Sequence, residues 1–314
     1  MATTTTNQRQ SFKDLTLGQL RGFAAVCRTG SYAAAARELL LTTPAVWEQM
    51  RGLERHYGCK LFHRSRQGIQ LTAEGEQLLA MVQPIVAGID STREALRQRG
   101  GALPQSLTIA TNLRVLTDEI SRGLRRFQRS YPEVRLHLVF TGNDVDQRVV
   151  SGEANVGLTL EPGPDRPTGL PIDYRPAGEV DYLLIVPARH TLAGAKLSNL
   201  KQLIQYPLVL GESAAYSRRR VEEILHRYDL RQSANIVVET SSDEYTLACV
   251  RAGLGIGISI GTGRGPLYHG LAARSLRRWF GTARLGFVWQ RGAHIPQSHH
   301  ELADAIAPCL KARG

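Results

Sequence analysis

The sequence predicts an α+β multidomain protein with a helical N-terminal head, a long connecting helix and a C-terminal α/β region of two lobes. Three observations support this fold class. Two short amphipathic helices meet across a tight turn within residues 31–54. An apolar stripe with heptad-like spacing continues through residues 72–98. Beyond Ser106, short apolar strands alternate with helices, an order typical of a parallel sheet with helices on both faces.

The first helix of the head is expected between Leu17 and Arg28. Thr16 and Gln19 match a capping box at its start, and Gly30 supplies a stop signal at its end. Apolar residues recur along this segment at helical spacing, so one of its faces should be buried within the head.

Residues 31–39 and 43–54 predict the two helices of a helix-turn-helix. Ser31 is expected to cap the first helix, and Thr43 is expected to cap the second ahead of Pro44. The segment between the helices leaves room only for a turn. Because the second helix of such a motif can enter the major groove of DNA, this pattern indicates DNA binding.

Residues 58–71 predict a short β-hairpin with apolar residues on both strands and a polar tip. A hairpin beside a helix-turn-helix forms a wing, so the predicted head is a winged helix-turn-helix. Arg64 and Arg66 lie at the tip, where they can reach phosphates or the minor groove.

Thr72 is expected to cap a long helix that continues to about Gln98. A helix of this length with one apolar stripe needs a partner, and we interpret it as a dimerisation helix. The alternative is that it packs on the chain's own C-terminal domain. Glycines and a proline then interrupt the chain within residues 100–104, as in a hinge or linker. The predicted seam consists of Leu78, Val82, Ile85, Ile89 and Leu96.

The remainder of the chain predicts two α/β units. The first has strands at 107–110, 134–140 and 154–160, and the second follows a Pro/Gly-rich stretch at 161–171. A final strand and helix, at 285–289 and 298–311, are expected to return to the first unit. In such two-lobed folds, ligands bind between the lobes, beside strand ends and helix N-termini. The strands expected in the second unit are 182–186, 208–210, 235–239 and 256–260.

The charge of the chain favours a polyanionic partner. The formal net charge is +11 and the pI is about 9.9. Residues 1–72 hold 10 Lys or Arg against 4 Asp or Glu, a net charge of +6. This is the highest density of positive charge in the chain, and it suits a module that faces phosphates.

The cysteine pattern and the apolar runs indicate a cytoplasmic protein. Four cysteines lie far apart without a CxxC pair, so neither a disulfide framework nor a zinc site is predicted. The polar N-terminus does not resemble a signal peptide. No apolar run approaches the ~20 residues of a membrane span, so no membrane partner is expected.

Several further motifs lack the context that their chemistry requires. Residues 257–261 match G-x-S-x-G, but Ser259 lies within an apolar strand, whereas a nucleophile elbow needs a strand, a sharp turn and a helix. Residues 253–255 lack the third glycine of a dinucleotide fingerprint, and residues 299–301 do not complete a zinc motif. We interpret Arg218–Arg220 as a solvated charge run, with an anion contact as the alternative. No catalytic residue, metal site or cofactor is therefore predicted.

Polar residues follow two of the predicted strands. Thr111 and Asn112 end the first strand and open the following helix, and Thr141 and Gly142 end the second strand in the same way. Such groups at helix N-termini suit a carboxylate, a sulfate or a phosphate. Arg114 is close enough in sequence to complete an anion site. The alternative is plain helix capping.

The head contains, at a spacing without gaps, Leu20, Phe23, Gly30–Ser31, Ala35–Ala36, Leu39, Pro44–Ala45, Gln49, Leu53–Glu54, Gly58, Leu61–Phe62, Arg64, Leu71–Thr72 and Gly75. With this pattern, residues 15–85 resemble the DNA-binding end of LysR-type transcriptional regulators. Residues 106–160 and 235–260 resemble that family's effector domain more loosely, through Tyr131–Val134 and Ala252–Gly257.

The resemblance implies a bacterial winged helix-turn-helix, a linker helix that pairs two subunits, and a periplasmic-binding-protein-like effector domain. Proteins that this chain resembles commonly form tetramers that bend promoter DNA, and a small metabolite tunes the bend. The expected partners are therefore double-stranded promoter DNA, a small-molecule effector and further copies of the chain in a homodimer or homotetramer. The implied boundaries are 13–72 for the head, 73–103 for the linker helix and hinge, and 104–314 for the effector domain, whose subdomains are 105–162 plus 269–314 and 163–268.

The reading helix departs from the family pattern at Trp47 and Glu48, where the family usually has a small hydroxyl residue followed by a basic or polar one. These side chains and Arg51 lie opposite the apolar stripe, so they should face DNA. Arg51 could bind a phosphate or a guanine, Glu48 could accept from a cytosine amino group, and Trp47 could press on a thymine methyl group. The alternative is that Glu48 pairs with Arg51 while Trp47 packs beside the wing. The predicted DNA-binding set is Ser31, Thr42, Thr43, Pro44, Trp47, Glu48, Arg51, Arg64 and Arg66.

Together these features predict a sequence-specific DNA-binding transcriptional regulator whose promoter binding is modulated by a small anionic metabolite. The competing hypothesis is a small-molecule binding protein or an enzyme on the two-lobed α/β domain, with the DNA-binding head as an accessory. Because no residue set supports catalysis, we expect that the chain is not an enzyme.

Overall fold

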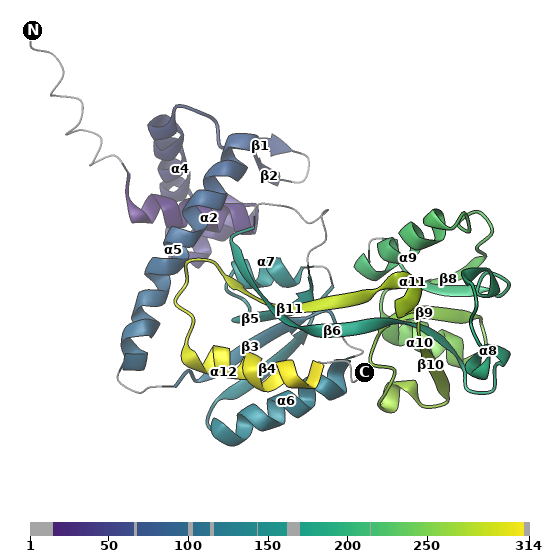
Figure 1. The fold of residues 1–314 in the computed structure, drawn as a ribbon. Helices are drawn as coiled ribbons and strands as arrows, with labels where there is room; N and C mark the ends of the chain where they lie inside the picture. Colours follow the sequence, from purple (N-terminus) through teal and green to yellow (C-terminus); the bar gives the residue numbers. More distant parts are fainter. Residues whose placement is uncertain are drawn as a thin grey trace, which may run out of the picture. The chain divides into compact units, whose positions relative to one another are not determined.

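The computed structural model describes residues 15–65, 68–99, 103–113, 116–142, 144–161, 170–213 and 215–310. These residues fall into two compact units, which are described one at a time (Figure 1). The first unit holds the described residues up to 99, together with 170–173 and 290–295. The second unit holds the other described residues, from 103 onward.

Helices and a hairpin form the head of the first unit. Their bounds are α2 Leu17–Thr29, α3 Tyr32–Glu38, α4 Thr43–Tyr57, β1 Phe62–Ser65 and β2 Gly68–Leu71. Helices α3 and α4 form the predicted helix-turn-helix. Strands β1 and β2 pair antiparallel, with Phe62 opposite Leu71, and this hairpin is the predicted wing.

One hydrophobic core holds the head together. Phe23, Val46, Met50, Leu53 and Leu61 are almost completely buried in it. Full burial of such a side chain contributes roughly 1.5–3 kcal/mol. Because Val46, Met50 and Leu53 repeat at helical spacing, α4 buries one face and exposes the opposite one.

Side-chain caps define where the helices of the head begin. Ser31 caps α3 as predicted, because its side chain accepts a hydrogen bond from the backbone N–H of Ala34. The prediction that Thr43 caps α4 is wrong. Thr42 has the extended backbone of a cap, and its Oγ1 accepts a hydrogen bond from the N–H of Ala45 at 3.3 Å. The helix therefore begins one residue earlier, and Thr43 is its first residue.

A long helix, α5 (Ala73–Arg99), follows the hairpin. Thr72 caps it as predicted, because Oγ1 of Thr72 accepts a hydrogen bond from the N–H of Gly75 at 3.0 Å. The same hydroxyl donates to the carbonyl of Lys60 at 2.7 Å. One threonine side chain therefore both caps α5 and ties it to the segment just before β1.

The apolar stripe of α5 has two different surroundings. Leu78 and Val82 are buried in the core of the head, whereas Ile85, Ile89 and Leu96 are exposed. The five residues predicted as one seam are thus divided, because the first turns of α5 pack on the head. The large exposed apolar residues along the described part of α5 are Met81, Ile85, Ile89 and Leu96.

A segment from the C-terminal part of the chain lies against α5. A Cβ atom at Gly292 would stand 2.5 Å from the carbonyl oxygen of Pro84, so only glycine fits this approach. The N–H of His294 also donates to Oγ of Ser91 at 2.9 Å. Residues 290–295 therefore cover part of α5, in line with the alternative interpretation, while the stripe from Met81 to Leu96 stays exposed.

The second unit is built on a nine-stranded sheet with the strand order β4-β3-β5-β11-β6-β9-β7-β8, in which β10 pairs with β6. The strand bounds are β3 Ser106–Thr111, β4 Arg135–Phe140, β5 Val156–Leu160, β6 Ile172–Pro187, β7 Leu208–Gly211, β8 Ile236–Thr240, β9 Ile256–Gly261, β10 Leu271–Ser275 and β11 Thr282–Gln290. Strands β3, β4 and β5 are parallel, as are β7, β8 and β9.

The helices complete two lobes on this sheet. Their bounds are α6 Thr117–Ser130, α7 Val145–Val150, α8 Thr191–Gly194, α9 Tyr216–Arg227, α10 Asp243–Arg251, α11 Arg277–Phe280 and α12 Gln297–Ile306, with a 3-10 helix η4 at Ala307–Leu310. In the first lobe, α6 and α12 lie on one face and α7 on the other (Figure 1). Strand β11 pairs antiparallel with β5, so the C-terminal strand returns to the first lobe and the predicted two-lobed fold is confirmed.

None of the helices in the described ranges has the length and apolar content that a membrane span requires.

Gly75 lies where α5 approaches the hairpin most closely. A Cβ atom there would stand 2.2 Å from the carbonyl oxygen of Leu61 and 2.8 Å from Cδ2 of Leu71. We expect Gly75→Ala to lower the free energy of unfolding by roughly 1–3 kcal/mol, because the backbone has to shift to relieve the overlap. Urea unfolding followed by circular dichroism measures this change.

Gly18→Ala is the matched control, because Gly18 lies in α2, where a Cβ atom would meet only Oγ1 of Thr16 at 3.8 Å. Alanine favours a helix over glycine, so this variant should be as stable as the parent or more stable by about 0.5–1 kcal/mol. An equal loss of stability in both variants would contradict the close approach at Gly75.

Candidate functional site

Five predicted DNA-binding residues lie on the accessible side of α4. Thr43, Pro44, Trp47, Glu48 and Arg51 are all exposed, and Trp47 keeps 45% of its surface accessible. Their spacing places them opposite the buried stripe of the helix, which repeats every 3.6 residues. The structure therefore brings these residues together on one face that a large partner can reach.

Arg51 and Trp47 stack on each other. The guanidinium carbon of Arg51 lies 4.8 Å from the centre of the Trp47 ring, within the range of a cation–π interaction. Glu48 forms no ion pair with any described residue, so the alternative Glu48–Arg51 pair is absent from this part of the structure. Trp47 also borders a recess of about 230 Å³ that it shares with Phe62 and His63 of the wing.

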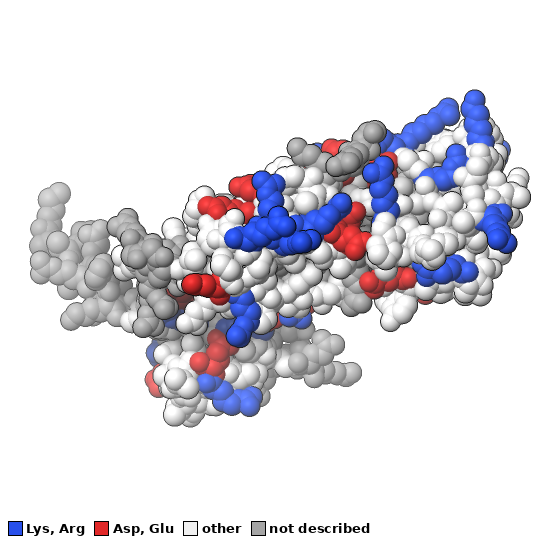
Figure 2. All heavy atoms as spheres, turned by 90° about the horizontal axis from the view of Figure 1, so that it is seen from below, with Lys and Arg blue, Asp and Glu red and all other residues white. Residues whose placement is uncertain are grey.

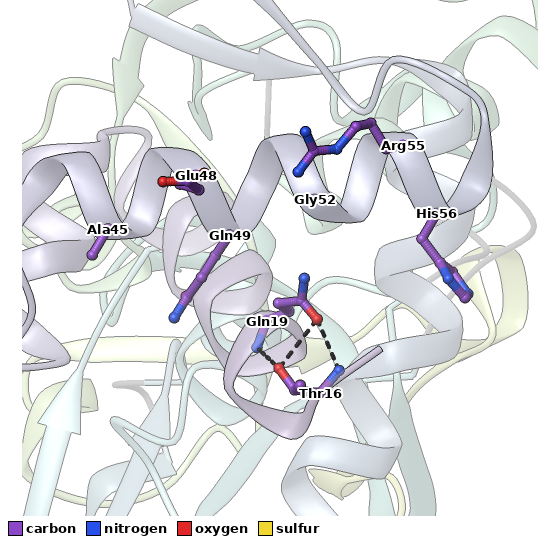
Figure 3. Close-up of a pocket in the computed structure, with 8 residues that line it drawn as sticks. All are labelled: Thr16, Gln19, Ala45, Glu48, Gln49, Gly52, Arg55 and His56. Carbon is purple, nitrogen blue, oxygen red and sulfur yellow. Dashed lines mark hydrogen bonds between the residues drawn. The ribbon is translucent and has the colours of Figure 1, made fainter. Parts of the chain in front are cut away.

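Glu48 faces a different groove, between α4 and the start of α2 (Figure 3). This groove measures about 770 Å³, and Thr16 and Gln19 form its wall on α2. The exposed Arg55 adds a positive charge further along α4. The sequence did not single out Arg55, because it lies beyond the first turns of the helix that the motif places in the groove of DNA. Glu48 and the Trp47–Arg51 stack thus lie on different flanks of α4.

The other residues of the predicted DNA-binding set either lie beside this face or fall outside the residues that the structure describes. The side-chain oxygens of Ser31 and Thr42 cap α3 and α4, and their hydroxyl hydrogens stay available as donors. Arg64 is described through its backbone, which pairs with Ile69 across the hairpin. Arg66 lies outside the described residues.

The predicted effector-binding residues meet at the C-terminal ends of β3 and β4. The N–H of Thr141 donates to the carbonyl of Thr111 at 2.9 Å, which holds the two strand ends together. Asn112 is partly buried, and its Oδ1 has no hydrogen-bond partner among the described residues. A Cβ atom at Gly142 would meet nothing within 4 Å, so space is open beside it. Arg114 lies outside the described residues.

The prediction that Thr111 and Asn112 open the following helix is wrong. Oγ1 of Thr111 accepts a hydrogen bond from the N–H of Leu113 at 3.1 Å and so stabilises a local turn. Helix α6 begins only at Thr117, after that turn, and it has no side-chain cap. The alternative that Thr111 and Asn112 serve only to cap the following helix therefore does not hold.

Arg148 of α7 joins this edge, although no motif or spacing in the sequence singled it out. Its Nε donates to Oγ1 of Thr141 at 3.3 Å. The same side chain pairs with Asp144 and Glu153, both at 2.9 Å. The guanidinium is therefore held in place beside Thr141, with its charge balanced by two carboxylates.

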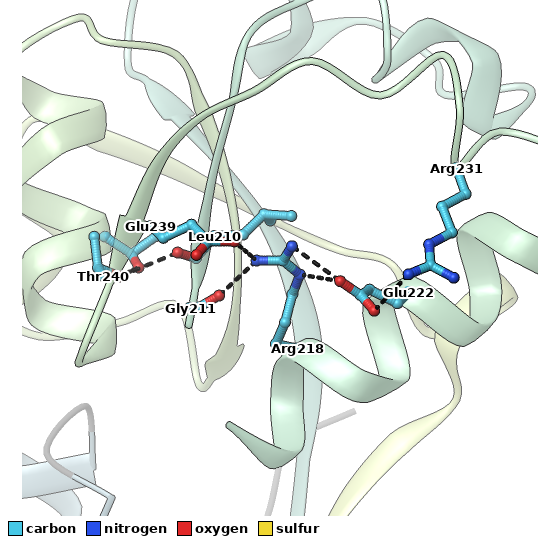
Figure 4. Close-up of polar contacts among 8 residues, drawn as sticks. Leu210, Gly211, Arg218, Glu222, Arg231, Glu239 and Thr240 are labelled. Atoms are coloured by element: carbon cyan, nitrogen blue, oxygen red, sulfur yellow. Dashed lines mark hydrogen bonds and ion pairs between the residues drawn. The ribbon is translucent and has the colours of Figure 1, made fainter. Parts of the chain in front are cut away.

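The predicted solvated run Arg218–Arg220 contains a buried arginine. Only 4% of the Arg218 side chain is exposed. It donates to the carbonyl of Gly211 at 2.7 Å and pairs with Glu222 and Glu239, both at 3.0 Å (Figure 4). A buried charge is stable only when it is paired, so this cluster fixes the start of α9 against β7 and β8. The solvated interpretation is wrong for Arg218.

The G-x-S-x-G motif is part of the core of the second lobe. Ser259 is buried in β9, and its Oγ donates to Oδ1 of Asp243 at 2.7 Å. Burial raises the pKa of Asp243 to about 6, the Ser259 hydrogen bond opposes this rise, and neighbouring Glu244 adds to it. The next helical segment is a 3-10 turn at Pro266–Tyr268, so the helix that a nucleophile elbow needs does not follow. No cluster of three metal-ligating side chains occurs within the described ranges.

Comparisons with known proteins match both units. The family described as "Bacterial regulatory helix-turn-helix protein, lysR family" matches residues 17–76, and the one described as "LysR substrate binding domain" matches residues 101–308. The transcriptional activator CmpR of Synechocystis is 30% identical over 78% of this chain and 79% of its own length. The transcriptional regulator CysB of Burkholderia cenocepacia is 24% identical over 92% of each chain.

Solved structures share the fold. A full-length OxyR variant from Pseudomonas aeruginosa superposes with a TM-score of 0.67 at 19% identity, covering 93% of this chain and 94% of that chain. HinK, a LysR family regulator from the same species, gives a TM-score of 0.57 at 22% identity, covering 94% of this chain and 99% of that chain.

These matches confirm the resemblance predicted from the sequence. They also confirm that the two-lobed region accompanies the DNA-binding head in a transcriptional regulator rather than in an enzyme. The chain belongs to the LysR family of bacterial transcriptional regulators.

Proposed function

We propose that this regulator reads its operator with the exposed face of α4 and with the wing. The reading residues would be Thr43, Trp47, Glu48 and Arg51. Ser31, Thr42 and Pro44 would lie beside the phosphate backbone at the helix N-termini, and Arg64 and Arg66 would contact it from the wing. The net charge of +6 in residues 1–72 supports a surface that faces phosphates.

The Trp47–Arg51 stack carries this proposal. An arginine that rests on an aromatic ring loses less conformational freedom when it forms two hydrogen bonds to a guanine edge. Trp47 would in turn present its apolar edge to a thymine methyl group. Glu48, on the other flank of α4, would accept from a cytosine amino group. The operator should therefore differ from one read by a small hydroxyl residue and a basic residue at these positions.

We expect Arg51→Ala to lower the affinity for a selected operator by about 10-fold or more, the value of a good bidentate base contact. The operator is first selected from random duplexes with the unaltered protein. Fluorescence anisotropy then measures binding to that duplex and to a scrambled duplex. The ratio of the two affinities should fall in Arg51→Ala and in Trp47→Ala.

Arg55→Ala is the matched control, since it removes the same charge from the same helix outside the stack. It should weaken binding to both duplexes alike and preserve their ratio. If Arg51→Ala and Trp47→Ala also preserved that ratio, the assigned reading face would be wrong.

We also propose that α5 pairs with α5 of a second copy, in a homodimer or homotetramer. Met81, Ile85, Ile89 and Leu96 form an exposed apolar stripe along the helix, on turns that the head and residues 290–295 leave uncovered. An identical helix would cover such a stripe by the packing of a two-stranded coiled coil. With α5 in this role, the chain would divide into a DNA-binding head at 13–72, a linker helix and hinge at 73–103, and an effector domain at 104–314.

We expect Ile85→Glu to shift the protein toward its monomer, because a carboxylate in the centre of an apolar seam loses its hydration. Sedimentation equilibrium of the full chain measures the mass. Gln77→Glu adds the same charge at an exposed position of the same helix and should leave the mass unchanged. An unchanged mass in Ile85→Glu would exclude this stripe as the dimer contact.

The small-molecule site would lie at the edge formed by Thr111, Asn112, Thr141 and Gly142, with Arg114 beside it. Backbone N–H groups, two hydroxyl groups and the Asn112 amide would supply donors to an anionic metabolite. An effector that binds the closed arrangement of the lobes, 105–162 plus 269–314 against 163–268, would shift the population toward it. That shift would change the spacing of the DNA-binding heads.

A thermal-shift screen of the full chain with sulfate, phosphate and succinate tests this site. A bound anion should raise Tm by about 2–4 °C for each kcal/mol of binding free energy. Thr111→Ala and Asn112→Ala should abolish that rise. Thr108→Ala, on the same strand but outside the proposed site, should retain it. A rise that survives both site variants would exclude the site.

A further inference from the structure

The second unit contains a recess of about 960 Å³ on the side of α6 and η4. The first turns of α6, the middle of β6 and the segment after β9 border it. Neither the strand end at Thr111–Asn112 nor the one at Thr141–Gly142 lines this recess, so it is separate from the proposed anion site. Figure 2, seen from the side of α6 and α12, shows acidic and basic side chains close together on this face.

Glu119 of α6 is a buried charge on the wall of the recess, with only 3% of the residue exposed. Its Oε1 accepts a hydrogen bond from Oγ1 of Thr262 at 2.8 Å, and Arg122 approaches the same oxygen at 3.7 Å. Its Oε2 has no hydrogen-bond partner among the described residues. A buried carboxylate oxygen without a donor is costly, so this atom favours a ligand that brings one.

A second carboxylate lies beside the first. Asp118 precedes Glu119 on α6 and lines the recess. A Cβ atom at Gly265 would stand 2.2 Å from Oδ2 of Asp118, so this carboxylate reaches the loop that follows β9. Two acidic groups thus face the same loop, and a cation between them would be attracted by both.

The rim of the recess carries the opposite charge. Arg125 and Arg264 line it, are exposed, and form no ion pair with any residue that the structure describes. The third carboxylate on the wall, Asp181, pairs with Arg277 at 2.8 Å and is therefore balanced. The recess offers an acidic wall with an unused acceptor and two uncommitted guanidinium groups.

We propose that this recess binds a small zwitterion, such as an ω-amino acid. The ammonium group of the ligand lies beside Asp118 and donates to Oε2 of Glu119 once that side chain turns its buried oxygen toward the recess. The carboxylate of the ligand pairs with Arg264 and Arg125. Separate groups of opposite sign distinguish this ligand from a simple anion or a simple cation. Glu119 belongs to the first lobe, whereas Arg264 follows β9 of the second, so the ligand links the two lobes.

Isothermal titration calorimetry of the full chain tests this proposal with matched compounds. Glycine, β-alanine, 4-aminobutyrate and 6-aminohexanoate vary the distance between the two charges. Succinate and 1,4-diaminobutane keep the four-carbon chain of 4-aminobutyrate but carry two like charges. We expect one of the amino acids to bind at least about 10-fold more tightly than both like-charged compounds, because an unpaired charge at either end is costly.

Variants then locate the bound compound. Glu119→Gln keeps the size of the side chain and removes its charge, and Arg264→Gln removes the positive charge on the exposed loop while it keeps a shorter polar side chain. Each should weaken binding of the amino acid by about 10-fold or more. Asn112→Ala, in the proposed anion site, should leave this affinity unchanged. Thermal unfolding checks that each variant is folded, and Arg264→Gln carries the test alone if Glu119→Gln does not fold.

The proposal is overturned if none of the amino acids binds, if 1,4-diaminobutane binds as tightly as they do, or if succinate does so in Asn112→Ala, where the proposed anion site is removed. It is also overturned if the folded variants at Glu119 and Arg264 retain the parent affinity. Loss of binding in Asn112→Ala alone would place the compound in the anion site and exclude the recess. Succinate binding that Asn112→Ala abolishes belongs to the proposed anion site. Failure of sulfate or phosphate to bind at Thr111 and Asn112 would not affect the recess.

Discussion

The burial of Val46, Met50 and Leu53 fixes the rotation of α4 about its own axis, and the surface that the head presents depends on that rotation. A turn of the helix by one residue would expose a core side chain and bury Trp47 or Arg51, at a cost of several kcal/mol. The core therefore determines which side chains are accessible. Thr72 also fixes the start of α5 against the head, because its hydroxyl binds the backbone of both Lys60 and Gly75.

Much of this fold was predictable because its signals are local. Helical spacing located α2, α3 and α4, and the alternation of strands and helices gave the two lobes. The errors were mostly at boundaries, as at Thr43, where either of two adjacent threonines can cap and only the backbone conformation of Thr42 decides. Strand β6 begins at Ile172, ten residues before the predicted strand, because its first part pairs with distant segments of the chain. Strand β10 was not predicted, since its pairing with β6 is equally non-local.

Polar residues whose partners lie far along the chain were even harder to predict from the sequence. Arg218 was predicted to be solvated and Glu119 was not singled out, since their partners Glu239 and Thr262 lie far along the chain. No spacing rule connects residues 119 and 262, and only the return of the chain across the lobes joins them. The predicted set at Thr111 and Thr141 was more accessible to sequence reasoning, because the ends of adjacent parallel strands meet at one edge.

Asp243 makes the stability of the second lobe depend on pH. Its pKa in the folded protein, about 6, lies above the ordinary value of 3.8. The folded chain therefore retains a proton that the unfolded chain releases as the pH rises from about 4 to 6, so this group lowers stability across that window. Above it, the lobe continues to bear the cost of an ionised carboxylate held away from water. Through Asp243, the core of the second lobe is thus more stable in mild acid than at neutral pH.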